Sequence, residues 1–224
     1  MQNKQDSQTI DLFAEINEVN PKRIELGEEA VILRGYATDI ATELFAEINA
    51  IIAESPLRQM QTPNGYTMSV RTSSCGPYGW VSDQRGYRYA QIDPLTNRPW
   101  PALPTRFLEL AHHAAQTAGF EKFVPDCCLI NSYQAGAKLS LHKDKDEHDF
   151  TAPIVSVSLG LPAIFLFGGL NRSDKTQRYR LEHGDVAVWG GKSRLAYHGI
   201  SPIIDGNHPL TGHQRINITF RKVM

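Results

Sequence analysis

Residues 131–147, NSYQAGAKLSLHKDKDE, decide how the rest of the chain can be interpreted. The pattern indicates an extended segment in which apolar Leu139 and Leu141 precede His142 and Asp144. Residues two apart on a strand point to the same side of a sheet, so His142 and Asp144 can present an imidazole and a carboxylate to one point. Such a pair suits iron, manganese or zinc, but it needs a third ligand from elsewhere. Taken alone, it is a short motif that also arises by chance.

Length and composition describe an ordinary globular chain. It has 224 residues, of which 41% are hydrophobic and 21% charged, enough for one large domain with a substantial core. No apolar run approaches 18 residues, and the start MQNKQDSQTIDLF lacks a basic region followed by an apolar one. We therefore expect neither a membrane span nor a secretory signal.

The net charge of −1 argues mildly against a protein that coats nucleic acid non-specifically, because neutralising phosphates requires an excess of basic residues. It does not exclude an enzyme that binds a few nucleotides. The three cysteines, Cys75, Cys127 and Cys128, contain no CxxC pair. We expect them to be buried thiols in a reduced, cytoplasmic setting.

The chain divides into three regions, at residues 1–35, 36–124 and 125–224. The first is a polar extension, expected to be partly disordered over residues 1–25, followed by a strand near Ala30–Leu33. The second opens with apolar residues at helical spacing over residues 39–55, which predict a helix with Thr38 or Asp39 as its N-cap. A second amphipathic helix is predicted over residues 104–119, ending at Gly119.

Between these helices, residues 56–104 are rich in glycine, proline and aromatic residues. Asn64 and Gly65 predict a hairpin turn. The aromatic residues could form a lid that stacks on a base or another ring, or they could supply a small core for this region. Composition alone favours the small core. The aromatic residues concerned are Tyr66, Tyr78, Trp80, Tyr87 and Tyr89.

After Pro125 the pattern becomes one of short strands separated by Gly, Asp, Asn and Pro, which is typical of a sandwich, jelly roll or barrel. His198 ends one of these strands and precedes Gly199, a suitable place for a metal ligand at the mouth of a barrel. A single histidine in such a position is more often a packing residue.

The last predicted strand, RINITFR, separates its residues by type. Ile216, Ile218 and Phe220 fall on one face, while two arginines, an asparagine and a threonine fall on the other. An exposed edge strand could have such a polar face. Alternatively, Arg215, Asn217 and Arg221 could receive a dicarboxylate inside a small barrel, with Asn131 and Tyr133 adding neutral donors. Two histidines and one aspartate would then leave open positions on iron for a chelating cosubstrate and for O₂.

These stretches resemble the AlkB family of iron(II)- and 2-oxoglutarate-dependent nucleic-acid dealkylases. The resemblance covers nearly the whole chain, from about residue 12 to residue 220. The matching stretches are TPNGYTMSV, GWVSDQRGYRYAQIDPLTNRPWPALP, CLINSYQAGAKLSLHKDKDE, PIVSVSLGLPAIFLFGGL, LEHGDVAVWGG, SRLAYHGI and RINITFR. It implies an α+β, mainly β fold with a double-stranded β-helix (jelly-roll) core in residues 125–224, flanking helices and an N-terminal nucleotide-recognition lid.

The resemblance also assigns site residues. It makes His142, Asp144 and His198 the iron ligands, and with Arg221 the catalytic set. It implies a 2-oxoglutarate site in which Arg215 holds the distal carboxylate, formed by Asn131, Tyr133, Leu139, Arg215, Asn217 and Arg221. Trp80 resembles the residue that stacks on the damaged base, which reverses the interpretation of the aromatic loops. The other implied substrate contacts are Thr62, Tyr66, Tyr87, Asp146 and Arg172. Departures from the family pattern include the longer polar N-terminus, Asn64 and Lys143.

The implied activity is DNA repair by oxidative dealkylation, a demethylase reaction using Fe(II), 2-oxoglutarate and O₂. N-alkyl groups on bases of the 1-methyladenine and 3-methylcytosine type would leave as formaldehyde, with succinate and CO₂ as coproducts. The target atom lies on the Watson–Crick edge, so the nucleotide must be unpaired or flipped out. We expect single-stranded DNA as partner, extending to RNA or to duplex DNA with a flipped base, and a monomeric enzyme.

Three other interpretations follow from the same residues. A 2-oxoglutarate oxygenase could hydroxylate a protein or a small molecule, although Trp80 and the TPNGYTMSV stretch argue against it. A zinc hydrolase could use the same triad, but would leave the arginine strand without a purpose. A jelly-roll binding module without activity would turn over no cosubstrate.

Overall fold

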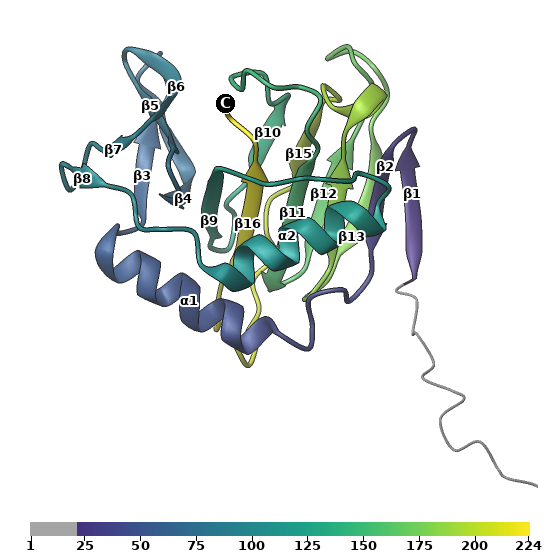
Figure 1. The fold of residues 1–224 in the computed structure, drawn as a ribbon, viewed down its shortest axis with the longest axis horizontal. Helices are drawn as coiled ribbons and strands as arrows, with labels where there is room; N and C mark the ends of the chain where they lie inside the picture. The colour runs from purple at the N-terminus through teal and green to yellow at the C-terminus, as the bar shows by residue number, and fades with distance from the viewer. Residues whose placement is uncertain (1–21) are drawn as a thin grey trace, which may run out of the picture.

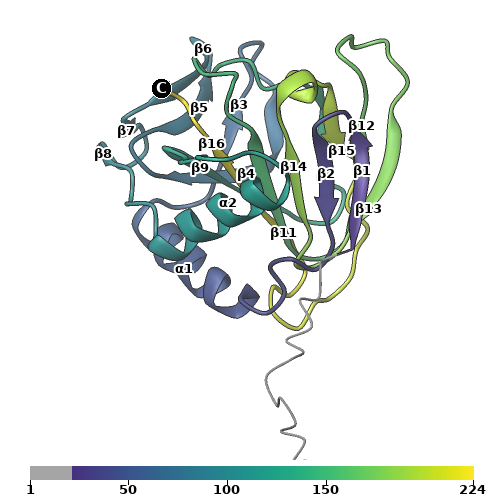
Figure 2. The ribbon, with the colours of Figure 1, turned by 45° about the vertical axis from the view of Figure 1, so that its right-hand side comes forward.

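The computed structural model describes residues 22–224 and consists of two facing β-sheets with two helices on the outer side of the larger one (Figures 1 and 2). The larger sheet has eight strands in the order β1-β2-β14-β11-β16-β9-β4-β3. Their bounds are β1 Arg23–Gly27, β2 Ala30–Leu33, β3 Arg58–Gln61, β4 Thr67–Cys75, β9 Cys127–Tyr133, β11 Ile154–Gly160, β14 Val186–Trp189 and β16 Arg215–Arg221.

The smaller sheet has four antiparallel strands in the order β10-β15-β12-β13. These are β10 Leu139–His142, β12 Ala163–Phe167, β13 Gln177–Leu181 and β15 His198–Ile200. Every strand predicted after Pro125 is present, and the mainly β, jelly-roll prediction is confirmed.

Helices α1 (Ala41–Glu54) and α2 (Thr105–Thr117) cross the outer face of the larger sheet (Figure 1). The predicted end of α2 is confirmed, because Gly119 follows the helix with a φ of 99°, a conformation that suits glycine. The predicted N-cap of α1 is wrong. Ile40 occupies that position without a side-chain cap, and Thr38 lies in the preceding turn, where its backbone N–H donates to the Gly35 carbonyl.

Two apolar cores lie on opposite faces of the larger sheet. One fills the space between this sheet and the helices, and includes Leu44, Phe107 and Ile218. The other lies between the two sheets and includes Phe165 and Trp189. The larger sheet therefore has an apolar layer on each of its two faces.

Strand β16 lies between β11 and β9 in the middle of the larger sheet, and all seven of its residues are buried. The edge-strand interpretation of RINITFR is therefore wrong. Ile216, Ile218 and Phe220 belong to the helix-side core. The polar side chains of β16 consequently point into the space between the sheets.

The aromatic region 56–104 forms a structured extension at one side of the sandwich (Figure 1). Strands β3 and β4 are the last two strands at one edge of the larger sheet. The predicted turn connects them, and Gly65 in this turn has a φ of 82°. Two smaller hairpins follow, formed by β5 (Gly79–Asp83) with β6 (Gly86–Ala90) and by β7 (Ile92–Asp93) with β8 (Arg98–Pro99). Met60, Val81 and Trp100 form a small separate core there.

The N-terminal prediction of partial disorder falls mainly on residues outside 22–224. Within the described part, β1 was not predicted, because its sequence RIELG has a weak alternation and pairs only through the short turn to β2. The three cysteines are buried and unpaired, as predicted. Neither helix formed by residues 22–224 is long and apolar enough to span a membrane.

Replacing Ile218 by alanine is expected to destabilise the protein by roughly 2–5 kcal/mol, because Ile218 is fully buried and its removal leaves a cavity. The measurement is urea unfolding followed by circular dichroism. Ile204→Ala is the matched control, since Ile204 is 77% exposed and its loss should change stability by less than about 0.5 kcal/mol. Equal effects of the two changes would contradict the placement of β16.

Candidate active site

A cavity of about 710 Å³ opens between the sheets, and the polar face of β16 forms part of its wall. Nearly all predicted site residues line this cavity. They are Thr62, Trp80, Tyr87, Asn131, Tyr133, Leu139, His142, Asp144, Asp146, Arg172, His198, Arg215, Asn217 and Arg221. Tyr66 is the exception, because it lies in the β3–β4 turn and is 74% exposed.

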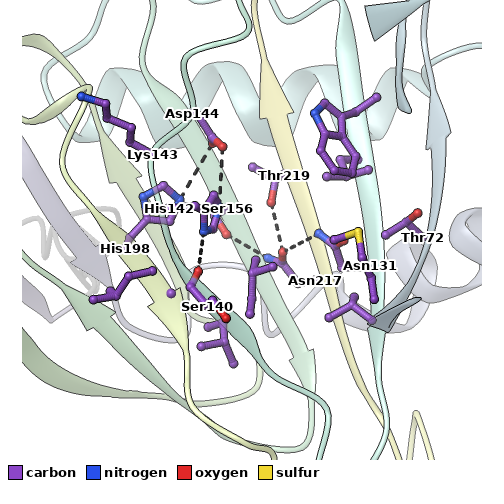
Figure 3. A pocket seen from close by; sticks show the side chains of 18 of the residues that line it. Thr72, Asn131, Ser140, His142, Lys143, Asp144, Ser156, His198, Asn217 and Thr219 are labelled. Carbon is purple, nitrogen blue, oxygen red and sulfur yellow. Dashed lines mark hydrogen bonds and ion pairs between the residues drawn. The ribbon is translucent and has the colours of Figure 1, made fainter. Parts of the chain in front are cut away.

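His142, Asp144 and His198 place one potential ligand atom each within 4.8 Å of one another (Figure 3). His142 and His198 are direct partners across the antiparallel pair of β10 and β15, which brings their ring centroids to 4.4 Å. Asp144 follows β10, with carboxylate oxygens 3.7 Å from His142 Nε2 and 3.9 Å from His198 Nε2. Among residues 22–224, no other group of three side chains meets this test for a metal site.

Backbone carbonyls orient both imidazoles. The Nδ1 of His142 lies 2.9 Å from the Ser140 carbonyl, and the Nδ1 of His198 lies 3.0 Å from the Ala196 carbonyl. A carbonyl can only accept, so each Nδ1 carries the proton and donates it. The lone pair of each neutral ring is then at Nε2, the atom that faces Asp144.

The charges at this point also suit a metal. Burial alone would raise the pKa of the Asp144 carboxyl, but Arg221, followed by His198 and His142, outweighs burial and holds that pKa below its usual range. Burial, with a smaller effect of His142, lowers the pKa of His198 to about 3. Asp144 is therefore ionised and His198 neutral at pH 7, as coordination requires.

Arg215 is a buried cation without a counter-charge. It is 1% exposed, its Nη2 donates to Ser158 Oγ at 2.9 Å, and its guanidinium lies 4.9 Å from the Tyr133 ring centroid. Its Nε and Nη1 have no hydrogen-bond partner, and no carboxylate of residues 22–224 forms an ion pair with it. Since a buried charge is costly unless it is paired, this side chain is prepared for an anion.

Arg221, six residues further along β16, behaves differently. Its Nε and Nη2 donate to Asp144 Oδ2 at 2.9 and 2.7 Å, and only Nη1 lacks a partner. The two arginines thus present unsatisfied N–H groups to one cavity. Such a pair of cationic donors fits a ligand with carboxylates at both ends.

Asn217 is already hydrogen-bonded within the protein. Its Nδ2 donates to Ser156 Oγ and the Val157 carbonyl, and its Oδ1 accepts from Asn131 and Thr219 (Figure 3). This network joins β9, β11 and β16 on the cavity side. The Nδ2 donor of Asn217, which was expected to face a dicarboxylate, is therefore used to hold together the strands that form the cavity wall.

Aromatic rings of the β5–β6 hairpin also line the cavity. On the β5–β6 hairpin, Trp80 pairs with Tyr89 and Ser82 pairs with Tyr87, so Trp80 and Tyr87 are diagonal neighbours. Their rings stack with centroids 5.6 Å apart and an interplanar angle of 14°. Trp80 Nε1 donates to Asp146 Oδ2 at 3.4 Å. This contact links the hairpin to the segment that carries Asp144. The predicted lid residues therefore share one cavity with the triad.

Sequence reasoning missed a buried cluster beside the triad. Glu147 is 4% exposed, accepts a hydrogen bond from Tyr89 Oη at 2.5 Å, and forms ion pairs with Arg194 and Arg221, each at 3.3 Å. The three closely spaced carboxylates of residues 142–147, HKDKDE, were a signal, because any of them that is buried needs a cation beside it. The sequence could not show which arginines supply them.

Comparison with known proteins supports one family. The model of the 2OG-Fe(II) oxygenase superfamily matches residues 29–221. The chain is 57% identical to the alpha-ketoglutarate-dependent dioxygenase AlkB of Escherichia coli (strain K12) over 95% of this chain and 97% of that protein. It is 42% identical to an AlkB homolog of Caulobacter vibrioides (strain NA1000 / CB15N), covering 79% of this chain and 80% of the other.

The solved structure of OsALKBH1 superposes with a TM-score of 0.80 at 30% identity, covering 90% of this chain and all of that one. The fold similarity therefore extends beyond the core strands to most of the described chain.

His198→Ala is expected to weaken Co(II) binding by more than about 100-fold, because loss of a ligand exceeds the 10–100-fold effect of losing an outer contact. Calorimetric titration of metal-free protein, together with the visible absorption of Co(II), would measure it. His113→Ala is the control, since His113 lies on α2, away from the triad. Unchanged affinity in His198→Ala would exclude this metal site.

Proposed function

Because this chain belongs to the AlkB family within the 2OG-Fe(II) oxygenase superfamily, and is thus an Fe(II)- and 2-oxoglutarate-dependent dioxygenase, we propose that it repairs nucleic acids by oxidative removal of N-alkyl groups from bases. One observation carries the proposal. A His-Asp-His triad, two arginines with unsatisfied donors and a stacked aromatic pair line a single cavity.

The residues of the cavity fit both groups that this chemistry needs. The donor set of two imidazoles and one carboxylate suits Fe(II) with open positions, so His142, Asp144 and His198 would hold the iron. The buried, unpaired guanidinium of Arg215 would hold the distal carboxylate of 2-oxoglutarate, with Tyr133 and Asn131 beside it. Leu139, Asn217 and Arg221 would complete its surroundings. Iron with 2-oxoglutarate and O₂ supplies the oxidising chemistry when bound.

The rest of the reaction depends on how the chain holds the substrate. Trp80 would stack on the alkylated base, Tyr87 would contact its nucleotide, and Asp146 would read the base edge. A cavity that lies between the two sheets admits a base only when the base is out of the duplex stack. For a base of the 1-methyladenine or 3-methylcytosine type, the balanced reaction converts the cationic N-methyl base, 2-oxoglutarate and O₂ into the neutral unmodified base, a proton, formaldehyde, succinate and CO₂.

Cations on the rim of the cavity fit a nucleic-acid backbone. Lys138, Lys143, Lys145 and Arg172 line the opening, and none of them forms an ion pair with a carboxylate of residues 22–224. Lys143 extends away from the triad (Figure 3), with Nζ 5.3 Å from the Tyr197 ring centroid. Thr62 and the exposed Tyr66 would add contacts to the strand. A few unpaired cations with stacking aromatics favour single-stranded DNA or RNA over a long duplex.

We further propose that the protein acts as a monomer in the cytoplasm. Three buried, unpaired thiols fit a reduced compartment.

The decisive test supplies Fe(II)-loaded protein with 2-oxoglutarate, O₂ and a single-stranded oligonucleotide containing 1-methyladenine. Formation of succinate, formaldehyde and unmodified adenine in equal amounts, all lost in His142→Ala, is the expected result. Succinate without repaired base would instead support an oxygenase of proteins or small molecules. Neither product from iron-loaded protein would refute the proposed activity.

Arg215→Ala is expected to raise the KM for 2-oxoglutarate by about 10²- to 4 × 10³-fold, because a buried charge pair that loses one partner costs roughly 3–5 kcal/mol. Steady-state assays with saturating oligonucleotide measure this KM. Arg178→Ala, on the exposed part of β13, is the control. A KM within threefold of the original would place the distal carboxylate elsewhere.

Trp80→Ala is expected to raise the KM for the oligonucleotide by about 5- to 150-fold, since stacking on one base contributes roughly 1–3 kcal/mol. Trp80→Phe keeps a stacking ring and should lose much less. Turnover of 2-oxoglutarate without nucleic acid serves as the internal reference and should not change. Equal losses in both variants would argue against a stacking role.

A further inference from the structure

The segment of residues 143–153 links β10 to β11 and has no helix or strand of its own. It carries Asp144 of the triad, Asp146 beside Trp80, and the buried Glu147. The His148 N–H donates to the Val223 carbonyl. Within residues 22–224, this is the only backbone–backbone hydrogen bond, other than those within helices and strands, that joins the segment to the rest of the protein. Secondary structure therefore does little to set its conformation.

Arg194 supplies the missing contacts. This side chain is 2% exposed and follows the short 3₁₀ helix η1 (Gly191–Ser193), 50 residues after Asp144. Its Nη1 donates to the Asp144 carbonyl at 3.1 Å, and its Nε donates to the Ala152 carbonyl at 3.0 Å. Its guanidinium also lies 5.4 Å from the Phe150 ring centroid. One side chain thus holds both ends of the segment.

Arg194 also balances charge next to the triad. Two carboxylates, the largely buried Asp144 and the buried Glu147, face two buried arginines, Arg194 and Arg221. Arg221 contacts both carboxylates, whereas Arg194 pairs with Glu147 only. Without Arg194, Glu147 would compete with Asp144 for the single remaining guanidinium, because a buried carboxylate needs a cation or a proton.

We infer that Arg194 is a positioning residue for the metal centre. It fixes the backbone at Asp144 and satisfies Glu147, which leaves Arg221 free to orient the Asp144 carboxylate toward His142 and His198. This role rests on the proposed function of Asp144 as an iron ligand. Arg194 would contact neither the metal nor 2-oxoglutarate nor nucleic acid, yet changes at Arg194 should weaken metal binding.

The first test is Co(II) titration of metal-free Arg194→Met. We expect binding to weaken about 10- to 100-fold, the range for losing an outer contact of a metal ligand. In the same metal-free variant, amide hydrogen exchange of residues 143–153 should accelerate more than elsewhere. Lys192→Ala, an exposed change in η1 that removes only the ion pair to Glu28, is the control and should leave both measurements unchanged.

The second test is a double-mutant cycle that separates charge competition from lost packing. Glu147→Gln removes the carboxylate that would compete for Arg221. Added to Arg194→Met, it should restore Co(II) affinity by about fivefold or more, a coupling typical of residues in one ionic network. A side chain that acts only through packing would show additive or greater loss in the double variant.

Either of two results would overturn the inference: Co(II) affinity of Arg194→Met within twofold of the original, or no recovery in the double variant. Circular dichroism checks that each variant folds, and Arg194→Lys replaces Arg194→Met if the latter does not. A lysine keeps the charge beside Glu147 but cannot reach both carbonyls, so an intermediate loss is expected. These titrations contain no nucleic acid or 2-oxoglutarate, so failure of the dealkylation assay would leave their outcome unaffected.

Discussion

The ion pair between Arg221 and Asp144 is the constraint on which the site depends. Arg221 ends the central strand of the larger sheet, and Asp144 follows a strand of the smaller one, so this contact joins the two sheets at the mouth of the cavity. The Arg221 side chain is 7% exposed and the Asp144 side chain 11%, and a charge in such a place is costly unless it is paired. The pair therefore keeps an ionised carboxylate beside the two imidazoles, as a metal requires.

The need to pair a buried charge also distinguishes the two arginines of β16. Arg221 is occupied by carboxylates of the protein, whereas Arg215 has only a serine hydroxyl and an aromatic ring. A fold that buries a cation without a partner is less stable for it, unless a ligand supplies the negative charge. The cavity is thus neutralised by the protein on the triad side and left cationic where 2-oxoglutarate would enter.

Much of this arrangement could be predicted because strands have a period of two. That period places His142 and Asp144 on one side and separates Ile216, Ile218 and Phe220 from the polar face of β16. Other features depend on partners distant in sequence. The alternation of RINITFR suits an edge strand as well as a central one, and only pairing with β9 and β11 distinguishes them. The N-cap of α1 was misplaced because Thr38 lies in the turn that precedes the helix.

The sequence by itself determined the types of ligand, the amphipathic strands and helices, and, through family resemblance, the chemistry. Only the tertiary structure decided which groups share one cavity and which are already occupied. The register of β10 against β15 sets His142 opposite His198, and packing brings Arg194 to the segment around Asp144. Local spacing follows from covalent geometry, whereas these pairings follow from burying charge and apolar surface together, which involves residues far apart in the chain.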